Sequence, residues 1–137
     1  MLSRPSRAPA ADERSPVVLI LSQDAVAAAL LGGLVETLGF TVRFARPPER
    51  PLESLRRVRP RICLVDCADP SCCSSELIGR ATMRGVSVVI FGTRAALERV
   101  RTLVSEHRLE TLLVPATVDE LQSVLQRARV AATPLRG

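Results

Sequence analysis

Short apolar runs alternate along the chain with longer segments in which apolar residues recur every three or four positions. The runs are rich in Val, Ile and Leu and have the length of strands that are buried on both faces of a parallel sheet. The longer segments have the period of helices that pack on such a sheet. The pattern predicts strands at 17–21, 41–44, 62–65, 86–91 and 112–114, and helices at 24–38, 51–59, 74–84, 94–108 and from 117 onward.

Residues at the segment ends support these helices. Asp24 stands at the N-cap of the first helix, Gly39 follows its last turn, and Pro51 occupies the first turn of the second. Thr117 and Glu120 have the spacing of a capping box at the start of the last helix. The periodicity predicts that the helices bury Leu52, Leu55 and Val58; Leu77, Ile78 and Ala81; Leu97, Val100 and Val104; and Val118, Leu121, Leu125 and Ala128.

Strands that alternate with helices over short connections predict an α/β fold. The expected architecture is a flavodoxin-like, doubly wound parallel sheet of the (βα)5 type with strand order 2-1-3-4-5. A chain of 137 residues suits a single domain. We assign this domain to residues 16–132, between a disordered N-terminal tail at 1–15 and a C-terminal tail at 133–137.

Cysteine usage and hydropathy indicate a cytoplasmic protein without a membrane span. The four cysteines include an adjacent pair and lack the spacing of a disulfide framework or of a paired Cys-x-x-Cys metal site. We therefore interpret them as reduced thiols and expect no bound metal. The apolar segment 17–35 is interrupted by polar residues at 22–24, so a strand followed by a helix fits it better than a membrane span. These cysteines are Cys63, Cys67, Cys72 and Cys73.

The basic residues are all arginines, and the chain contains no lysine. The net charge of +5 is concentrated at 43–61, where seven arginines face two glutamates. A solvated surface is the usual meaning of such a run. The alternative is a surface for a nucleic acid or an acidic partner, and a nucleic-acid binder would use Arg56, Arg57 and Arg59. Nucleic acid is not the expected partner, because the chain has no Trp or Tyr and only three Phe to stack on bases.

Chemistry in parallel α/β sheets collects outside the carboxyl ends of the strands. Asp66 is the candidate reactive group at this edge, whereas Asp24 is expected to cap a helix. The residues at the edge are Ser22, Gln23 and Asp24 after the first strand, Asp66 and Cys67 after the third, Gly92 and Thr93 after the fourth, and Val114 and Pro115 after the fifth.

With these residues in place, the segment 17–131 resembles a response-regulator receiver domain of the CheY-like kind. The resemblance rests on the alternating strands and helices and on Asp66 at the end of the third strand, with Pro70 four residues later. It rests also on the Leu-Gly-Phe step at 38–40 and on Pro115 just after the fifth strand.

The resemblance implies a set of site residues that this chain matches only in part. Receivers have a phosphoryl-accepting aspartate, an acidic pair that holds Mg²⁺, a hydroxyl residue and a lysine that bind the phosphoryl group, and an aromatic residue on the fifth strand. Asp66 matches the acceptor and is the phosphoacceptor candidate. The other positions differ from the family pattern. Ser22 and Gln23 occupy the positions of the acidic pair, and Gly92, with Thr93 beside it, occupies that of the hydroxyl residue. Val114 replaces the lysine, and Thr111 replaces the aromatic residue.

These departures predict a degenerate pseudo-receiver that acts in bacterial signal transduction by protein–protein contact. Phosphoryl transfer depends on positioning and on charge neutralisation, and losing one such electrostatic element typically costs about 10²–10³ in rate. We therefore expect no enzymatic activity, no cofactor and no metal. The alternative is a phosphorylatable receiver in a two-component phosphorelay, with Asp66 as the acceptor and Mg²⁺ as the cofactor.

The first helix carries no charge at 25–35 and has small residues where solvent-facing positions are expected. Glycines inside a helix cost about 1 kcal/mol each relative to alanine, so a close contact is one interpretation and drift in an alanine-rich sequence is the other. The expected partner is a histidine kinase or another signalling protein, or a second copy of the chain. The last two helices and the fifth strand form the other candidate surface. The interaction face predicted on the first helix consists of Ala28, Ala29, Gly32 and Gly33.

Overall fold

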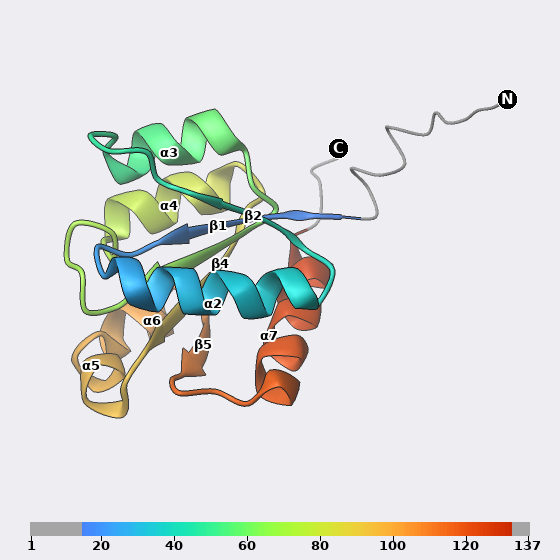
Figure 1. Ribbon diagram of the computed structural model, residues 1–137. Helices are drawn as coiled ribbons and strands as arrows, with labels where there is room; N and C mark the ends of the chain where they lie inside the picture. Colours follow the sequence, from blue (N-terminus) through green and yellow to red (C-terminus); the bar gives the residue numbers. More distant parts are fainter. Residues whose placement is uncertain (1–14, 133–137) are drawn as a thin grey trace, which may run out of the picture.

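The computed structural model describes residues 15–132. Its strands form one parallel sheet in the order β2-β1-β3-β4-β5, with helices on both faces (Figure 1). The predicted fold class and strand order are confirmed. The tails predicted at 1–15 and 133–137 lie outside the described residues, except for Ser15.

All strands run in the same direction, so their carboxyl ends meet at one edge of the sheet. No helix within the described range is both long and apolar enough to cross a bilayer. The strands are β1 (Val17–Leu21), β2 (Thr41–Phe44), β3 (Ile62–Asp66), β4 (Ser87–Gly92) and β5 (Glu110–Leu113). The helices are α2 (Ala25–Thr37), α3 (Pro51–Val58), α4 (Ser75–Met83), α5 (Arg94–Arg99), α6 (Arg101–His107) and α7 (Val118–Ala131).

The sheet separates two apolar cores, because neighbouring residues of a strand point to opposite faces. On one face Ile20 and Leu64 pack with α2 and α7, and on the other Leu19 and Cys63 pack with α3, α4 and α5. None of these four side chains is more than 1% exposed. Strands β1 and β3 are therefore buried on both faces, which fixes the position of Asp66 at the end of β3.

The caps predicted at both ends of α2 and at the start of α7 are confirmed. Asp24 Oδ1 accepts a hydrogen bond from the Ala27 backbone N–H at 3.0 Å and caps α2. Thr117 and Glu120 form the reciprocal hydrogen bonds of a capping box, at 2.9 and 3.1 Å, before α7. Gly39 has a φ of +95°, in the left-handed region that favours glycine.

The helix predicted at 94–108 is divided into α5 and α6 at Val100. The Val100 N–H bonds to the Leu97 carbonyl at 3.2 Å, three residues back, which is a tighter turn than that of an α-helix. No proline or glycine marks this turn in the sequence. Leu97, Val100 and Val104 all stay packed against the core, so the apolar period continues through the break and hides it.

Several boundaries and one helix position also differ from the prediction. β5 covers 110–113 rather than 112–114, and β4 covers 87–92 rather than 86–91. Val118 was expected to point inward but is 48% exposed, because it is the first residue of α7 and stands at the open end of the helix. Val124, six residues further along α7, belongs to the core although it was not predicted there.

Candidate functional site

The residues that follow the strands meet at the carboxyl edge of the sheet. The strand register places the ends of β1 and β4 on either side of Asp66, the last residue of β3. Ser22 follows β1, and Gly92 ends β4. Val114, just after β5, donates its backbone N–H to the Gly92 carbonyl at 2.9 Å. The structure thus brings these sequence-predicted residues together.

Neutral groups hold the Asp66 carboxylate. Its Oδ2 accepts a hydrogen bond from the Ser22 hydroxyl at 2.7 Å, and its Oδ1 accepts one from the Ala68 backbone N–H at 3.0 Å. No arginine within residues 15–132 forms an ion pair or a hydrogen bond with this carboxylate. A hydroxyl and an amide therefore position Asp66 without a cation.

The two positions that the resemblance assigns to metal-binding carboxylates carry a hydroxyl and an amide, Ser22 and Gln23. Gln23 donates to the Ser71 hydroxyl at 3.2 Å. Asp24, one residue further on, is used as the cap of α2. Mg²⁺ prefers several oxygen ligands in octahedral geometry, carboxylates among them. In the described part of the chain no three acidic, cysteine or histidine side chains form a group that could hold a metal ion. The donor set does not fit Mg²⁺.

The space beside Gly92 is filled by the thiol of Cys67. A Cβ atom on residue 92 would lie less than 3.0 Å from Cys67 Sγ, closer than real Cβ atoms approach other heavy atoms. A serine or threonine at position 92 would have to displace this sulfur. The neighbouring Thr93 does not take its place, because its hydroxyl accepts a hydrogen bond from the Ala96 N–H at 3.2 Å and caps α5. Reasoning from the sequence missed the contact, since only the strand register places Cys67 beside Gly92.

The thiols of the loop after β3 are held in the protonated form. Burial raises the pKa of Cys67, and the charge of Asp66 raises it further. Burial raises the pKa of Cys72 to about 12, with a contribution from the hydrogen bond that this thiol donates to Asp69. Burial also raises the pKa of Cys73 to about 11. The thiolate is the reactive form of cysteine. Burial therefore disfavours the thiolate form of these side chains, which pack within the loop.

Asp69 organises the same loop from within. It is only 8% exposed, and its carboxylate accepts hydrogen bonds from the Ser71 N–H at 3.0 Å, the Ser71 hydroxyl at 2.7 Å and the Cys72 thiol at 3.1 Å. Burial alone would raise the pKa of Asp69, but the hydrogen bonds from Ser71 and Cys72 outweigh burial and lower it. Because Gln23 donates to Ser71, the loop is also tied to the end of β1.

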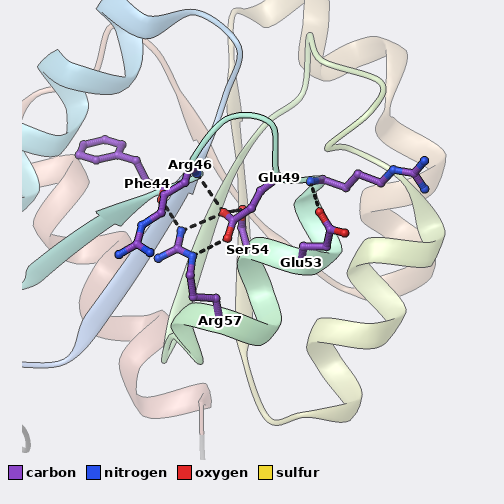
Figure 2. Close-up of polar contacts among 7 residues, drawn as sticks. Phe44, Arg46, Glu49, Glu53, Ser54 and Arg57 are labelled. Carbon is purple, nitrogen blue, oxygen red and sulfur yellow. Dashed lines mark hydrogen bonds and ion pairs between the residues drawn. The ribbon is translucent and has the colours of Figure 1, made fainter.

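A second polar network fixes the loop between β2 and α3 (Figure 2). The Glu49 carboxylate accepts hydrogen bonds from the Arg57 guanidinium, from the Ser54 hydroxyl at 2.6 Å and from the Arg46 N–H at 2.9 Å. Arg57 also donates to the Phe44 carbonyl at 2.9 Å, which joins α3 to the end of β2. Hydrogen bonding from Arg57, and then from Ser54, lowers the pKa of Glu49 to about 2. Arg57 is thereby engaged away from Asp66.

Val114 occupies the position that the resemblance gives to a lysine. Its side chain packs against the core that α2 and α7 cover. The peptide bond that follows, between Val114 and Pro115, is cis. Val114 therefore contributes packing and no charge to the edge of the sheet.

The interaction face predicted on the first helix is partly wrong. Ala28 and Gly32 are buried, because they share the side of α2 that packs on the sheet. A Cβ on Gly32 would lie 2.7 Å from Cζ of Phe44, so the glycine leaves room for this ring. Ala29 and Gly33 are exposed as predicted. They belong to an apolar surface, here called the α2 face, which consists of Val26 (70% exposed), Ala29, Leu30 (68%), Gly33 and Leu34 (38%).

Comparisons with known proteins identify the fold. No family model and no curated protein matches the sequence. The structure is similar to the signal receiver domain of an HD domain-containing protein from Pseudomonas fluorescens Pf-5, with a TM-score of 0.72 and 20% identity over 87% of this chain and 90% of that one. It is also similar to full-length FixJ from B. japonicum, with a TM-score of 0.73 and 19% identity over 87% of this chain and 60% of that one. A third similar structure is the receiver domain of sensor histidine kinase PA1611 from Pseudomonas aeruginosa, crystallised with magnesium in its cleft, with a TM-score of 0.68 and 22% identity over 85% and 98% of the two chains. The chain therefore has the fold of the CheY-like response-regulator receiver domains.

Proposed function

We propose that this chain is a pseudo-receiver, a non-catalytic domain that acts in bacterial signal transduction through protein contacts and without phosphorylation of Asp66. The observation that carries the proposal is the surroundings of the Asp66 carboxylate, which bonds to the Ser22 hydroxyl and the Ala68 amide and, within residues 15–132, to no cation. Free cysteines at Cys63 and in the loop after β3 support a place in the cytoplasm.

A phosphoryl group on Asp66 would bring negative charge to an edge with little to neutralise it. Catalysis of phosphoryl transfer comes almost entirely from positioned cations and hydrogen-bond donors. The four positions that the resemblance assigns to them carry Ser22, Gln23, Gly92 and Val114, of which only the first two have polar side chains and none is charged. Removing one such element typically costs about 10²–10³ in rate. The combined departures support slow or absent phosphorylation.

The alternative is a phosphorylatable receiver in a phosphorelay, with Asp66 as the acceptor and Mg²⁺ as the cofactor. One observation favours it: Asp66 is partly exposed, whereas the other residues of β3 are buried. A small phosphoryl donor would therefore reach the carboxylate. A cation recruited from solution would have to replace the missing side chains, and the donor set around Asp66 argues against this.

Intact-mass measurement distinguishes the two functions. The protein is incubated with acetyl phosphate and Mg²⁺, alongside Asp66→Asn, which keeps the size of the side chain and removes the acceptor. We expect both masses to stay unchanged. A stoichiometric gain of one phosphoryl group by the wild-type protein, absent from Asp66→Asn, would overturn the pseudo-receiver proposal in favour of the alternative.

The α2 face is the surface on which we place the protein contact. Val26, Leu30 and Leu34 follow one another at intervals of one helical turn, so their exposed side chains form a continuous apolar stripe. No charged residue interrupts it at 25–35. Exposed apolar patches of this kind mark interaction sites. The partner is a histidine kinase or another signalling protein with an apolar surface of its own, and a second copy of the chain is the other outcome to be tested.

A further inference from the structure

A cavity of about 390 Å³ opens at the amino edge of the sheet, the edge opposite to Asp66. It lies where α3 and α4 end, two helices that run side by side over one face of the sheet (Figure 1). We call it the α3–α4 cavity. The residues that line it are Leu55, Arg59, Pro60, Arg84 and Val86.

The α3–α4 cavity has an apolar floor and a basic rim. Leu55 and Val86 are 1% and 8% exposed and form the floor together with the buried Pro60. Arg59 and Arg84 are exposed and form the rim. Arg59 is the residue that caps the end of α3, and Arg84 caps the end of α4. Each helix thus delivers one guanidinium to the same opening.

Among the described residues, 15–132, no carboxylate neutralises this rim. The chain has no Asp or Glu at 54–65 or at 77–97, the two segments that build the cavity. Neither Arg59 nor Arg84 forms an ion pair with any other residue of the described range. Arg57, by contrast, forms an ion pair with Glu49. Within the part of the chain that the structure describes, Arg59 and Arg84 therefore present unpaired positive charge above an apolar floor.

The backbone of Arg59 is held in a conformation that few residues other than glycine adopt. Its φ is 53°, and its N–H donates to the Leu55 carbonyl at 3.0 Å, which closes the last turn of α3. The turn fixes the base of the Arg59 side chain beside the cavity before any ligand arrives, which reduces the ordering that binding would require.

We propose that the α3–α4 cavity binds an acidic segment of a partner protein. An apolar side chain of the segment would rest on Leu55 and Val86, and flanking carboxylates would pair with Arg59 and Arg84. Arginine binds carboxylates in a two-pronged geometry, and an apolar centre inside a polar rim is typical of protein interfaces. Because the cavity lies at the edge opposite to Asp66, this site is independent of whether Asp66 accepts a phosphoryl group.

The composition of the cavity favours a protein over a nucleic acid. Single-stranded nucleic acids bind where aromatic rings stack on bases along a basic groove. No aromatic residue lines the α3–α4 cavity. Of the chain's three phenylalanines, Phe40 and Phe91 belong to the core on the other face of the sheet and Phe44 ends β2.

Fluorescence anisotropy with a labelled peptide, made of glutamates around a central leucine, tests the proposal. The double variant Arg59→Gln with Arg84→Gln should bind the peptide about tenfold more weakly, equivalent to about 1.4 kcal/mol. The matched control is Arg94→Gln with Arg108→Gln, which removes the same charge and includes a residue with the same backbone conformation, at a φ of 54°. At physiological salt these distant charges are screened, so the control should stay within about twofold of the wild type.

Two further measurements locate the contact. The methyl resonances of Leu55 and Val86 should shift on addition of the peptide, and a peptide with glutamines in place of glutamates should leave them unchanged. Arg59→Gly, which suits the left-handed backbone, should weaken binding while the unfolding midpoint is maintained. The proposal is overturned if the wild-type protein does not bind the acidic peptide, if both arginine pairs weaken binding equally, or if a single-stranded oligonucleotide binds more tightly and displaces the peptide.

Discussion

The sulfur of Cys67 occupies the space into which a side chain on Gly92 would project. A Cβ on Gly92 would stand less than 3.0 Å from Cys67 Sγ, whereas Ala96 Cβ, the next atom, would lie at an ordinary contact distance of 3.6 Å. The thiol is therefore the close obstacle, and positions 67 and 92 are coupled. Because Cys67 follows Asp66 directly, the pair borders the candidate phosphoacceptor.

We expect Gly92→Ala to destabilise the protein by about 1–3 kcal/mol, since overpacking a buried site forces a neighbouring side chain out of its preferred position. In a Cys67→Ala background the same substitution should cost less, with a coupling energy of about 0.5–3 kcal/mol between the two positions. Urea denaturation of the wild type, both single variants and the double variant measures this coupling. Strictly additive effects would show that the thiol does not fill the space beside Gly92.

Replacing each of the two glycines of α2 by alanine should have a different effect on the stability of the protein. Gly33→Ala should stabilise the protein by about 0.5–1 kcal/mol, because alanine is the better helix former and nothing lies within 4 Å of the added Cβ. Gly32→Ala would place its methyl group 2.7 Å from the ring of Phe44, so ring displacement offsets the helical gain. The midpoint of thermal unfolding should be higher for Gly33→Ala than for Gly32→Ala. In a Phe44→Ala background the two midpoints should no longer differ. Equal effects in the wild-type background would contradict this account of Gly32.

The Glu49 network should make stability depend on pH in the acid range. The pKa of Glu49 is about 2 in the folded protein, against an ordinary value of 4.5. A lowered pKa means that the stabilising contribution is complete above about 4.5 and is lost as pH falls towards about 2. The difference in unfolding free energy between the wild type and Glu49→Gln should therefore shrink across this window. A difference that stays constant from neutral pH down to pH 2 would show that the Arg57 contact does not stabilise the fold.

A charge on the α2 face should abolish partner binding without unfolding the domain. Ala29→Glu and Leu30→Glu alter exposed residues, for which stability typically changes by less than about 0.5 kcal/mol. A carboxylate buried in an apolar interface would be desolvated without a partner. Pull-down with the intact protein measures capture, with Ser75→Glu, an exposed change at the start of α4, as the matched control.

Light scattering on the purified protein then identifies the occupant of the α2 face. A dimer that Ala29→Glu dissociates would identify a second copy of the chain, and a monomer that captures another protein would identify a signalling partner. If both α2 variants capture the partner as well as the wild type does, the contact surface lies elsewhere.

Most of the fold could be predicted from the sequence because the patterns that indicate strands and helix caps involve residues close together along the chain. Strands β1 and β3 are buried on both faces, which leaves runs of apolar residues without polar interruption. The caps at Asp24 and Thr117 involve residues three positions apart, and their spacing is visible in any printed sequence. The break at Val100 left no such trace, since no proline or glycine marks it.

The orientation of α2 was misjudged for a physical reason. Its residues at 25–35 include no charge, so no charged side chains mark which side of the helix faces solvent and which is buried. Contact with Phe44 of β2, which Gly32 permits, resolves the ambiguity in the folded chain. Of the four small residues that were predicted to face solvent, two pack inward.

From the residues alone it followed that Asp66 ends a strand, and the resemblance to receiver domains implied that an acidic pair and a lysine are missing around it. Which groups replace them depended on folding. The Ser22 hydroxyl on Asp66, the Cys67 thiol against Gly92 and the two arginines of the α3–α4 cavity each join segments at least twenty residues apart. Such contacts depend on strand register and helix packing, which arise when the whole chain collapses on its two cores, and no local spacing encodes them.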